Sequence, residues 1–188
     1  AERIRKYTNY IEKKKLEVAT ERQEELDSLN EMYCNVQQDI DTAMHFDRRL
    51  FEKTREDEDF LHIYLGQGTI ASSRPIDYKK QERLEVGDEL TEMPEKIYQL
   101  FEHIDGAPIC SDMKDSNAIG IVGTKEALYG MFKNIVIDIA VRHYYGDVRL
   151  YMLVDDEKRY QWARFLPHLM NAGGICLLYT SDAADDMQ

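Results

Sequence analysis

Long apolar runs and paired cysteines are the features that this sequence most clearly lacks. No stretch approaches the roughly 18 apolar residues of a membrane-spanning helix, and no apolar leader follows the first residue, so we expect neither a membrane span nor a signal peptide. The three cysteines, Cys34, Cys110 and Cys176, lie far apart and form no CxxC pair. This arrangement excludes a disulfide framework and a cysteine-rich zinc site, and it fits a reducing compartment.

Positive charge is also scarce. The 188 residues carry 24 basic and 36 acidic side chains, which gives a formal charge of −12. A chain this acidic repels phosphate, so as a whole it is a poor partner for nucleic acid or for anionic lipid headgroups. Hydrophobic residues make up 43% of the chain, which is enough for a real core. The length allows one domain with an appendage, or two small domains.

The last stretch, residues 173–188, differs in composition from the rest of the chain. No lysine or arginine follows Arg164, and small residues accumulate. Residues 176–186 can be back-translated into a sequence that resembles a transposase adapter used in DNA library preparation. We therefore expect residues 173–188 to be sequencing-adapter read-through, and we exclude them from fold reasoning as a fusion scar would be excluded. Since the other end carries no initiator Met, we expect an internal piece of a longer protein.

Residues 1–46 contain no glycine and no proline and are rich in good helix formers, which predicts a long helical stalk. Apolar residues recur in it at spacings of three and four: Ile4, Tyr7, Ile11, Leu26, Leu29, Tyr33, Val36, Ile40 and Ala43. Charged side chains interrupt this stripe between Lys14 and Glu25, so we expect a helix without strong self-association. Two interpretations stay open: a projecting coiled-coil-like stalk, or an amphipathic helix that lies on its own domain.

Residues 47–172 alternate between short apolar runs and amphipathic stretches. Strands are expected at residues 60–65, 78–86, 118–123 and 148–154, the first of them closed by a turn at Gly66–Gln67–Gly68. Helices are expected from Pro94 until Gly106 and Pro108, from 125 to 145 behind an N-cap at Thr124, and from 157 to 171. This order favours an α/β fold with a mostly parallel sheet and covering helices.

The apolar runs and the helical spacing also predict which side chains form the core of this domain. These residues are Phe60, Leu65, Ile121, Val122, Ile135, Ile139, Leu150, Leu153, Trp162 and Leu166.

The segment around Gly123 lies between an expected strand and an expected helix, where phosphate-binding loops occur. Such a loop needs the pattern GxxxxGK[ST], but here Thr124 separates Gly123 from Lys125, no Ser or Thr follows the lysine, and Gly120 is too close to serve as the first glycine. We therefore interpret the segment as a tight turn between strand and helix, without a nucleotide site.

Other candidate residues for chemistry are also better explained structurally. Asp155 and Asp156 follow an apolar strand, as magnesium-binding acids do in P-loop ATPases, but without a phosphate loop they are better interpreted as an acidic pair at the N-terminus of a helix. The histidines His45, His62, His103, His143 and His168 are dispersed and form no HxxxH or HExxH pattern. We expect no catalytic, cofactor-binding or metal-binding residue in this chain.

Three phrases in register resemble one family. The phrase LFEKTREDEDFLHIYLGQG, at residues 50–68, resembles the LWER…D-DFL-V-R-G-G phrase of the FtsK/SpoIIIE-type ATPases of type VII secretion, the EssC group. Residues 118–153 resemble the segment that follows it there, and RYQWARFLPHL, at residues 159–169, resembles the W-W-R-W-LPH phrase. Phe51, Tyr64, Tyr160 and Phe165 stand where Trp, Arg, Trp and Trp are expected. Three of these changes keep an aromatic ring, whereas Tyr64 loses a charge and any salt bridge made with it.

The resemblance covers nearly all of residues 1–171 and implies a place in a larger protein. In that family, regulatory domains and two transmembrane helices precede this region, and P-loop ATPase domains with ATP and magnesium follow it. Residues 1–46 would be a juxtamembrane stalk at the cytoplasmic face of the bacterial membrane, and residues 47–172 an ATPase-like domain, degenerate at its nucleotide site.

The parent would be a protein-secretion motor that hydrolyses ATP, and this piece would not itself be catalytic. Its partners would be other copies in a hexamer, other membrane components of the secretion system and small helical-hairpin export substrates, with no nucleic acid. Two alternatives stay open: a freestanding nucleotide-binding α/β protein with a non-standard loop, and a coiled-coil adaptor.

Overall fold

The structure is a computed structural model that describes residues 2–79, 89–116 and 118–179. The chain divides into two compact units, each of which is built from two separate stretches of sequence. The first unit comprises Ala1–Cys34 and Leu65–Cys110, and the second comprises Asn35–Tyr64 and Ser111–Gln188. Helices and small sheets make the chain an α/β protein, as the sequence predicts.

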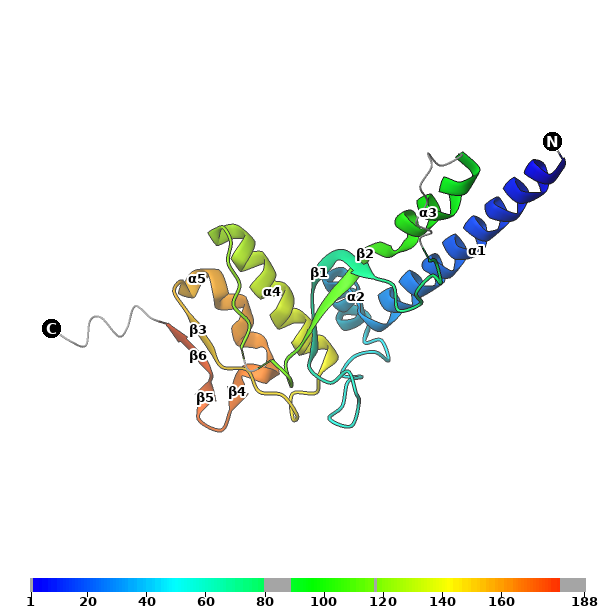
Figure 1. Cartoon of the computed structure of the whole chain (residues 1–188). Helices are drawn as coiled ribbons and strands as arrows, with labels where there is room; N and C mark the ends of the chain where they lie inside the picture. Colours follow the sequence, from blue (N-terminus) through cyan, green and yellow to red (C-terminus); the bar gives the residue numbers. More distant parts are fainter. Residues whose placement is uncertain (1, 80–88, 117, 180–188) are drawn as a thin grey trace. The chain divides into compact units, whose positions relative to one another are not determined.

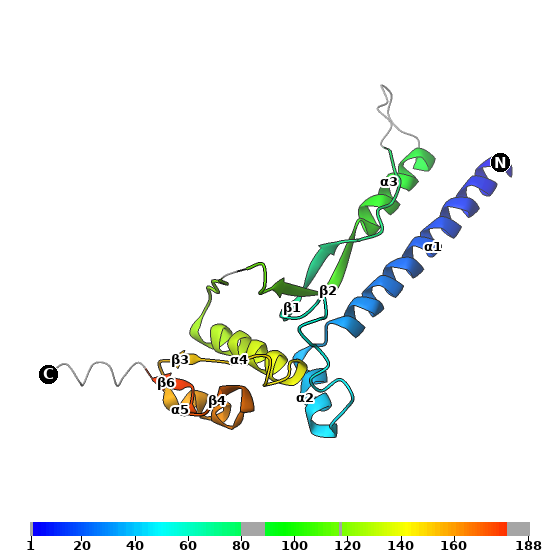
Figure 2. The same ribbon diagram turned by 90° about the horizontal axis from the view of Figure 1, so that it is seen from below.

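The first unit is dominated by two helices that lie side by side (Figures 1 and 2). Helix α1 spans Glu2–Met32 and packs against α3, Glu89–Phe101. A two-stranded sheet of β1, His62–Ala71, and β2, His103–Asp112, continues from them, and the boundary between the units cuts both strands.

Two buried charged side chains fix α1 to the end of α3 and to the loop that follows β1. Arg22 donates from Nε to the carbonyl oxygen of Phe101 at 2.7 Å and from Nη2 to that of Arg74 at 2.8 Å. Glu25 accepts hydrogen bonds from the hydroxyl of Ser72 at 2.6 Å and from the hydroxyl and the backbone N–H of Ser73 at 2.6 and 2.7 Å. Burial alone would raise the pKa of Glu25, but these hydrogen bonds and Arg22 lower it. The charge that interrupts the apolar stripe is therefore a structural contact.

The second unit consists of two packed helices and several short elements. Helix α2, Val36–His45, packs against α4, Lys125–Arg142. The short elements that follow are β3, Met152–Val154; α5, Glu157–Tyr160; the 3-10 helices Gln161–Phe165 and Pro167–Leu169; β4, Met170–Asn171; β5, Gly174–Ile175; and β6, Leu177–Tyr179. Its apolar core lies between α4, β3 and the 3-10 helices and contains Val136, Met152, Val154, Ala163, Leu169 and Leu177.

The predicted helix over residues 1–46 is two helices. The break falls at residues 33–35, where Asn35 caps α2 by accepting hydrogen bonds from the N–H groups of Gln37 and Gln38. The Gln38 side chain returns a hydrogen bond to the Asn35 N–H, which completes a capping box. An asparagine that caps a helix ends the preceding one, although neither glycine nor proline marks the position.

The predicted turn at residues 66–68 is wrong, because β1 runs through both glycines. A side chain at Gly68 would lie 3.1 Å from the Ile109 side chain on the neighbouring strand, so close approach explains this glycine. Gly106 and Pro108, expected to end the preceding helix, lie within β2, where Gly106 has a positive φ of 71°. That helix ends earlier, at Phe101, and contains Pro94 in its interior.

The ends of the later helices also differ from prediction. Helix α4 begins behind Thr124 as expected but ends earlier, at Arg142. Its last carbonyl oxygens accept hydrogen bonds from another segment: that of Val141 from the Phe51 N–H at 2.8 Å, and that of Arg142 from the Lys53 N–H at 2.9 Å. The helix expected over residues 157–171 is one short α-helix and two 3-10 helices, because the residue before Pro167 is extended.

The mostly parallel sheet is not present in the part of the chain that the structure describes, which holds three two-stranded sheets. Strand β3 pairs in parallel with β6, Met152 lying opposite Leu177, and β4 pairs antiparallel with β5. The strand expected at residues 118–123 forms no ladder, and the one at 148–154 is shortened to β3. Most of the strand expected at 78–86 lies outside the described residues.

Most of the predicted core residues are covered. Phe60 and Ile139 are buried, and Leu150, Trp162 and Leu166 pack against the core of the second unit. Leu65, Ile121 and Ile135 are half-buried. Val122 and Leu153 are errors, with exposed fractions of 99% and 69%, because the segment around Val122 joins no sheet and Leu153 lies on the outer face of β3.

Residues 174–179, within the segment expected to be adapter read-through, form β5 and β6, and Leu177 is buried against β3. The pairing shows that β3 accepts an apolar strand beside it. The origin of the segment stays a prediction.

A pair of leucine substitutions tests the position of this core. Leu169 is fully buried, so Leu169→Ala should lower the free energy of unfolding by ~2–5 kcal/mol. Leu153→Ala removes the same atoms from an exposed site and should change it by less than about 0.5 kcal/mol. Urea unfolding followed by circular dichroism measures both values, and equal losses would place Leu153 in the core after all.

Candidate functional site

The segment before α4 is organised around the start of the helix. The Thr124 hydroxyl accepts a hydrogen bond from the Ala127 N–H at 3.4 Å, and the Thr124 carbonyl accepts one from Leu128 at 2.9 Å. A side chain at Gly123 would meet Ala127 and Leu128, whereas one at Gly120 would meet nothing. Thr124 is thus the N-cap of α4, as the sequence predicts.

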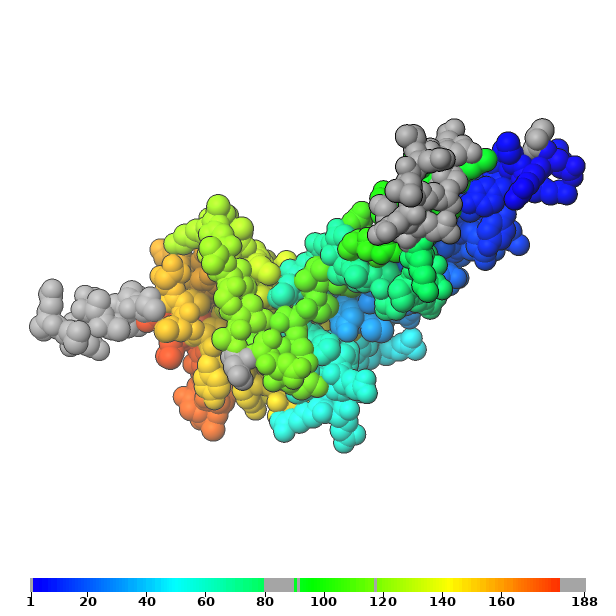
Figure 3. Space-filling view, viewed as in Figure 1, coloured from blue at the N-terminus to red at the C-terminus, as the bar shows by residue number. Residues whose placement is uncertain are grey.

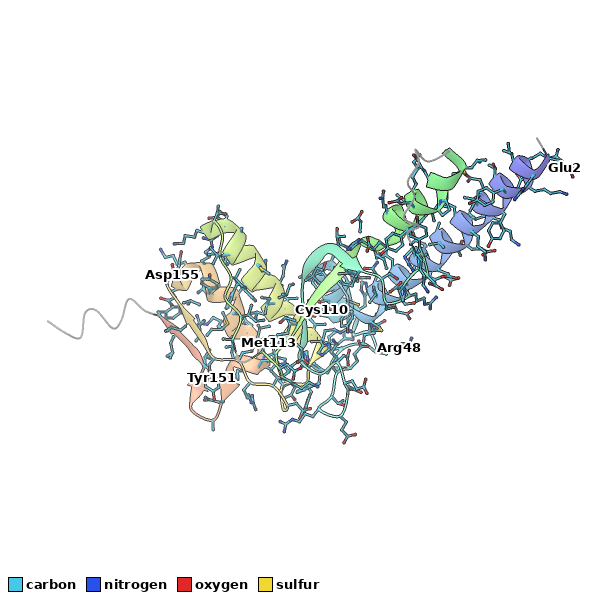
Figure 4. The ribbon with its side chains drawn as sticks, viewed as in Figure 1. Glu2, Arg48, Cys110, Met113, Tyr151 and Asp155 are labelled. Atoms are coloured by element: carbon cyan, nitrogen blue, oxygen red, sulfur yellow. The ribbon has the colours of Figure 1, made fainter. Side chains whose placement is uncertain are left out.

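Two ion pairs join the first turn of α4 to the residues that follow β3. Lys125 Nζ lies 3.4 Å from a carboxylate oxygen of Asp155, which is labelled in Figure 4. Glu126 pairs with Arg159, whose guanidinium also lies 4.0 Å from the centre of the Tyr129 ring. Each cation near the expected phosphate position already has an anionic partner within the chain.

The second acid of the predicted pair has the helical role that the sequence suggests. Asp156 is the N-cap of α5, and its carboxylate accepts a hydrogen bond from the Arg159 N–H at 3.1 Å. Asp155 is exposed beside it and pairs with Lys125.

A cavity of about 410 Å³ opens beside these ion pairs. Its walls are apolar and aromatic, with Lys125, Asp155 and Arg159 as the charged members; the other lining residues are Ile121, Leu128, Tyr129, Phe132, Leu153, Val154 and Tyr160. Tyr160 makes edge contacts with the rings of Tyr129 and Phe132 at 5.3 and 5.6 Å. The cavity suits an apolar group better than a triphosphate, because its cations are already neutralised.

Charges are also buried together at the opposite end of α4. Asp39 of α2 is fully buried, and its carboxylate oxygens have no hydrogen-bond partner; the nearest Arg142 nitrogen is 4.0 Å away. Arg142 also pairs with Glu52, and Asp138 accepts a hydrogen bond from the Tyr64 N–H at 3.2 Å. We call Asp39, Glu52, Lys53, Asp138 and Arg142 the buried charge cluster.

Lys53 is the second cation of the buried charge cluster. It is 4% exposed, its Nζ lies 3.2 Å from an Asp59 carboxylate oxygen, and it donates to the His62 carbonyl oxygen at 3.3 Å. Next to it, His143 accepts a hydrogen bond from the Leu61 N–H through Nε2 at 3.0 Å. These contacts hold residues 52–62 against α4.

Burial shifts the acid–base equilibria of this cluster strongly. It raises the pKa of Asp39 to about 7, with a further upward contribution from Asp138. It raises the pKa of Asp138 to about 6, against the downward effects of the Tyr64 hydrogen bond, Lys53 and Arg142. Burial and the nearby Lys53 lower the pKa of His143 to about 4, so this histidine is neutral at pH 7.

Two of the five histidines, distant in sequence, come into contact in the fold. His143 and His168 are fully buried, and His168 donates to the His143 carbonyl oxygen at 2.8 Å. His62 pairs with Asp112 at 3.2 Å, whereas His45 and His103 are exposed. Within the described ranges, no three His, Cys, Asp or Glu side chains are placed to hold a metal ion.

The buried charge cluster was missed at the sequence level. Asp138 and Arg142 stand at positions that the apolar side of α4 should occupy, since Asp138 follows Ile135 by three residues and Arg142 follows Ile139 by three. The signal that could have revealed the buried charge cluster was a pair of opposite charges on the apolar face of a helix. Nothing in the local sequence marks Asp39 as their neighbour.

No helix of the described residues is long and apolar enough to cross a membrane, in agreement with the sequence analysis.

Comparison with known proteins shows that the chain is similar to components of bacterial type VII secretion systems. No protein-family profile matches the chain. The chain is 28% identical to the ESX secretion system protein EccC of Geobacillus thermodenitrificans over 98% of its own length, and 28% identical to the type VII secretion system protein EssC of Staphylococcus aureus over 91%. The similarity to the EssC group that the three phrases indicate is therefore confirmed. The chain spans only 12–13% of the length of these relatives.

The shifted pKa values predict how stability depends on pH. Asp39 and Asp138 have raised pKa values in the folded state, so the stability they contribute is full below pH ~4 and is lost as the pH rises towards 6 and 7. His143 has a lowered pKa, so its contribution is present above its unfolded pKa and is lost as the pH falls from about 6.5 to about 4. Between pH ~4 and ~6, the two carboxyl groups lower the free energy of unfolding as the pH rises, whereas His143 raises it. Because two groups act in one direction and one in the other, the three together lower the free energy of unfolding over this range.

Asp39→Asn keeps the shape of the protonated side chain and removes its titration. The variant should match the parent chain near pH 4 and exceed its free energy of unfolding by at least about 1 kcal/mol at pH 8. Asp41→Asn, on the exposed side of α2, is the control and should show no such trend. Urea unfolding across this pH range measures the difference, and a gap that does not change with pH would contradict the assignment.

The ion-paired lysine predicts that this chain does not bind ATP measurably. Lys125 is held by Asp155, and the sequence offers no GxxxxGK[ST] loop. Calorimetric titration of the chain with magnesium and ATP should show no heat of binding. Micromolar affinity that disappears in Lys125→Ala but persists in Lys133→Ala would overturn this prediction and favour a freestanding nucleotide-binding protein.

Proposed function

We propose that this chain is the juxtamembrane and ATPase-like segment of a membrane-anchored FtsK/SpoIIIE-type ATPase that powers type VII protein secretion. The observation that carries the proposal is the similarity to EssC and EccC proteins along nearly the whole chain. The segment links the membrane to the motor domains and has a structural or regulatory role. Residues 1–46 serve as the juxtamembrane stalk, and residues 47–172 as the degenerate ATPase-like domain.

The contacts of the second unit support a role without catalysis. The side chains weighed as nucleotide or magnesium ligands make structural contacts: Asp156 caps α5, and Lys125 pairs with Asp155. ATP and magnesium are then bound by downstream domains of the parent protein, and this segment transmits or restrains their motion.

The partners follow from the same proposal. The parent assembles as a hexamer at the cytoplasmic face of the bacterial membrane, contacts other membrane components of the secretion system and exports small helical-hairpin proteins. The formal charge of −12 makes the chain as a whole a poor partner for nucleic acid.

The native DNA around this segment tests the proposal directly. Downstream of codon 172, the native reading frame should continue into domains that carry GxxxxGK[ST] motifs, and upstream of codon 1 it should encode two apolar runs of about 20 residues. The native frame should also put an apolar residue at the position of Leu177, because the core beside β3 needs one. A native stop codon soon after 172, without any P-loop downstream, would favour the coiled-coil adaptor.

A further inference from the structure

The N-terminal half of α1 carries a charge opposite to that of the rest of the protein. Residues 2–17 contain six basic and three acidic side chains, a formal charge of +3, whereas all other residues together carry 18 basic and 33 acidic side chains. The acidity that makes the whole chain a poor partner for anionic surfaces is thus absent from this one segment. The net charge of the whole chain therefore does not describe the surface of this segment.

Four of the six cations of this segment share one side of the helix. Arg3, Lys6, Lys13 and Lys14 recur at spacings that place them on one face, together with Glu2 and Glu17. The opposite side of α1 faces α3, where Ile11, Glu12 and Lys15 line a shared groove.

The basic face is solvent-exposed. The side chains of Lys6 and Lys13 are 73% and 76% exposed, and that of Lys14 is 50% exposed. Their ion pairs with Glu2 and Glu17 are surface pairs, which water and salt weaken. Figure 3 shows this half of α1, in blue, at the surface of the visible face.

Two tyrosines stand between the cations. Tyr7 and Tyr10 are 37% and 55% exposed and lie on the same face as Lys6 and Lys14. Tyrosine rings partition to the headgroup level of a bilayer, with the ring towards the acyl chains and the hydroxyl in water. We propose that this face, Arg3, Lys6, Tyr7, Tyr10, Lys13 and Lys14, lies against the anionic headgroups of a lipid bilayer.

Charge and surface chemistry together favour a lipid surface. A basic helix face with interleaved aromatic rings suits an interface where one side is anionic and the other apolar. From Arg3 to Glu21, the next acid of α1 after Glu17, the helix extends about 27 Å at 1.5 Å per residue. The contact rests on the membrane-adjacent placement proposed above.

Vesicle binding of the 188-residue chain tests the contact. Flotation with vesicles of equal parts phosphatidylglycerol and phosphatidylcholine should recover the chain, and vesicles of phosphatidylcholine alone should not. Lys6→Glu, Lys13→Glu and Lys14→Glu combined should lower the partition coefficient by about tenfold or more, given the effect of each lysine near an anionic surface. The control combines Lys79→Glu, Lys133→Glu and Lys158→Glu, which makes the same change of net charge on exposed lysines elsewhere and should leave binding within about twofold.

Ionic strength gives a second readout. At about 0.01 M salt the screening length is about 30 Å, and the acidic remainder repels the vesicle; at about 0.15 M it falls to about 8 Å, and only the adjacent basic face is felt. Binding should therefore pass through a maximum and disappear at about 1 M salt. Equal loss in the two triple variants, or equal binding to neutral vesicles, would overturn the proposal and leave α1 as a spacer or a protein-binding helix. The placement in a secretion ATPase would survive that result, because the native DNA tests it separately.

Discussion

The interaction on which the second unit depends is the contact of Arg142 with carboxylates from two other segments. Arg142 stands at the last turn of α4 and reaches Asp39 on α2 and Glu52 on the chain that follows it. Removing one partner from such a cluster leaves a buried charge without compensation, which costs far more than the pair itself contributes. Helix α2, residues 51–53 and the end of α4 are therefore fixed together, and α4 stops where its carbonyl oxygens receive Phe51 and Lys53.

The two ends of α4 use charge in different ways. At the first turn, Lys125 and Glu126 are exposed and pair with Asp155 and Arg159, in water that screens them. At the last turn, Asp138 and Arg142 are buried, and burial raises the pKa of Asp138 and of the neighbouring Asp39. A phosphate site would need unpaired cations at the first turn, yet there the chain provides its own anions. The ion pairs thus hold the start of α4 against the residues that follow β3.

Sequence predicted the features that local chemistry determines. The Thr124 cap and the similarity to the EssC group could both be read from adjacent residues. The rest depended on residues distant in sequence. Gly68 was predicted to lie in a turn. The close approach of the Ile109 side chain explains this glycine instead, and Ile109 belongs to another strand that the local sequence does not reveal. Asp39 looked like an ordinary helical acid, since the helix that buries it is about a hundred residues away. Residues 118–123 have the composition of a buried strand, but no strand of the described residues pairs with them, and Val122 is exposed.

The attachment of Arg22 has a consequence for how this protein can diverge. Both carbonyl oxygens that the guanidinium contacts belong to the main chain, at Arg74 and Phe101. Main-chain oxygens are the same whatever side chain the residue carries, so these two positions can drift freely while the contact persists. Selection then falls on one side of the contact alone, the arginine of α1. Relatives as distant as these could keep the helix in place while the loops beneath it change almost completely.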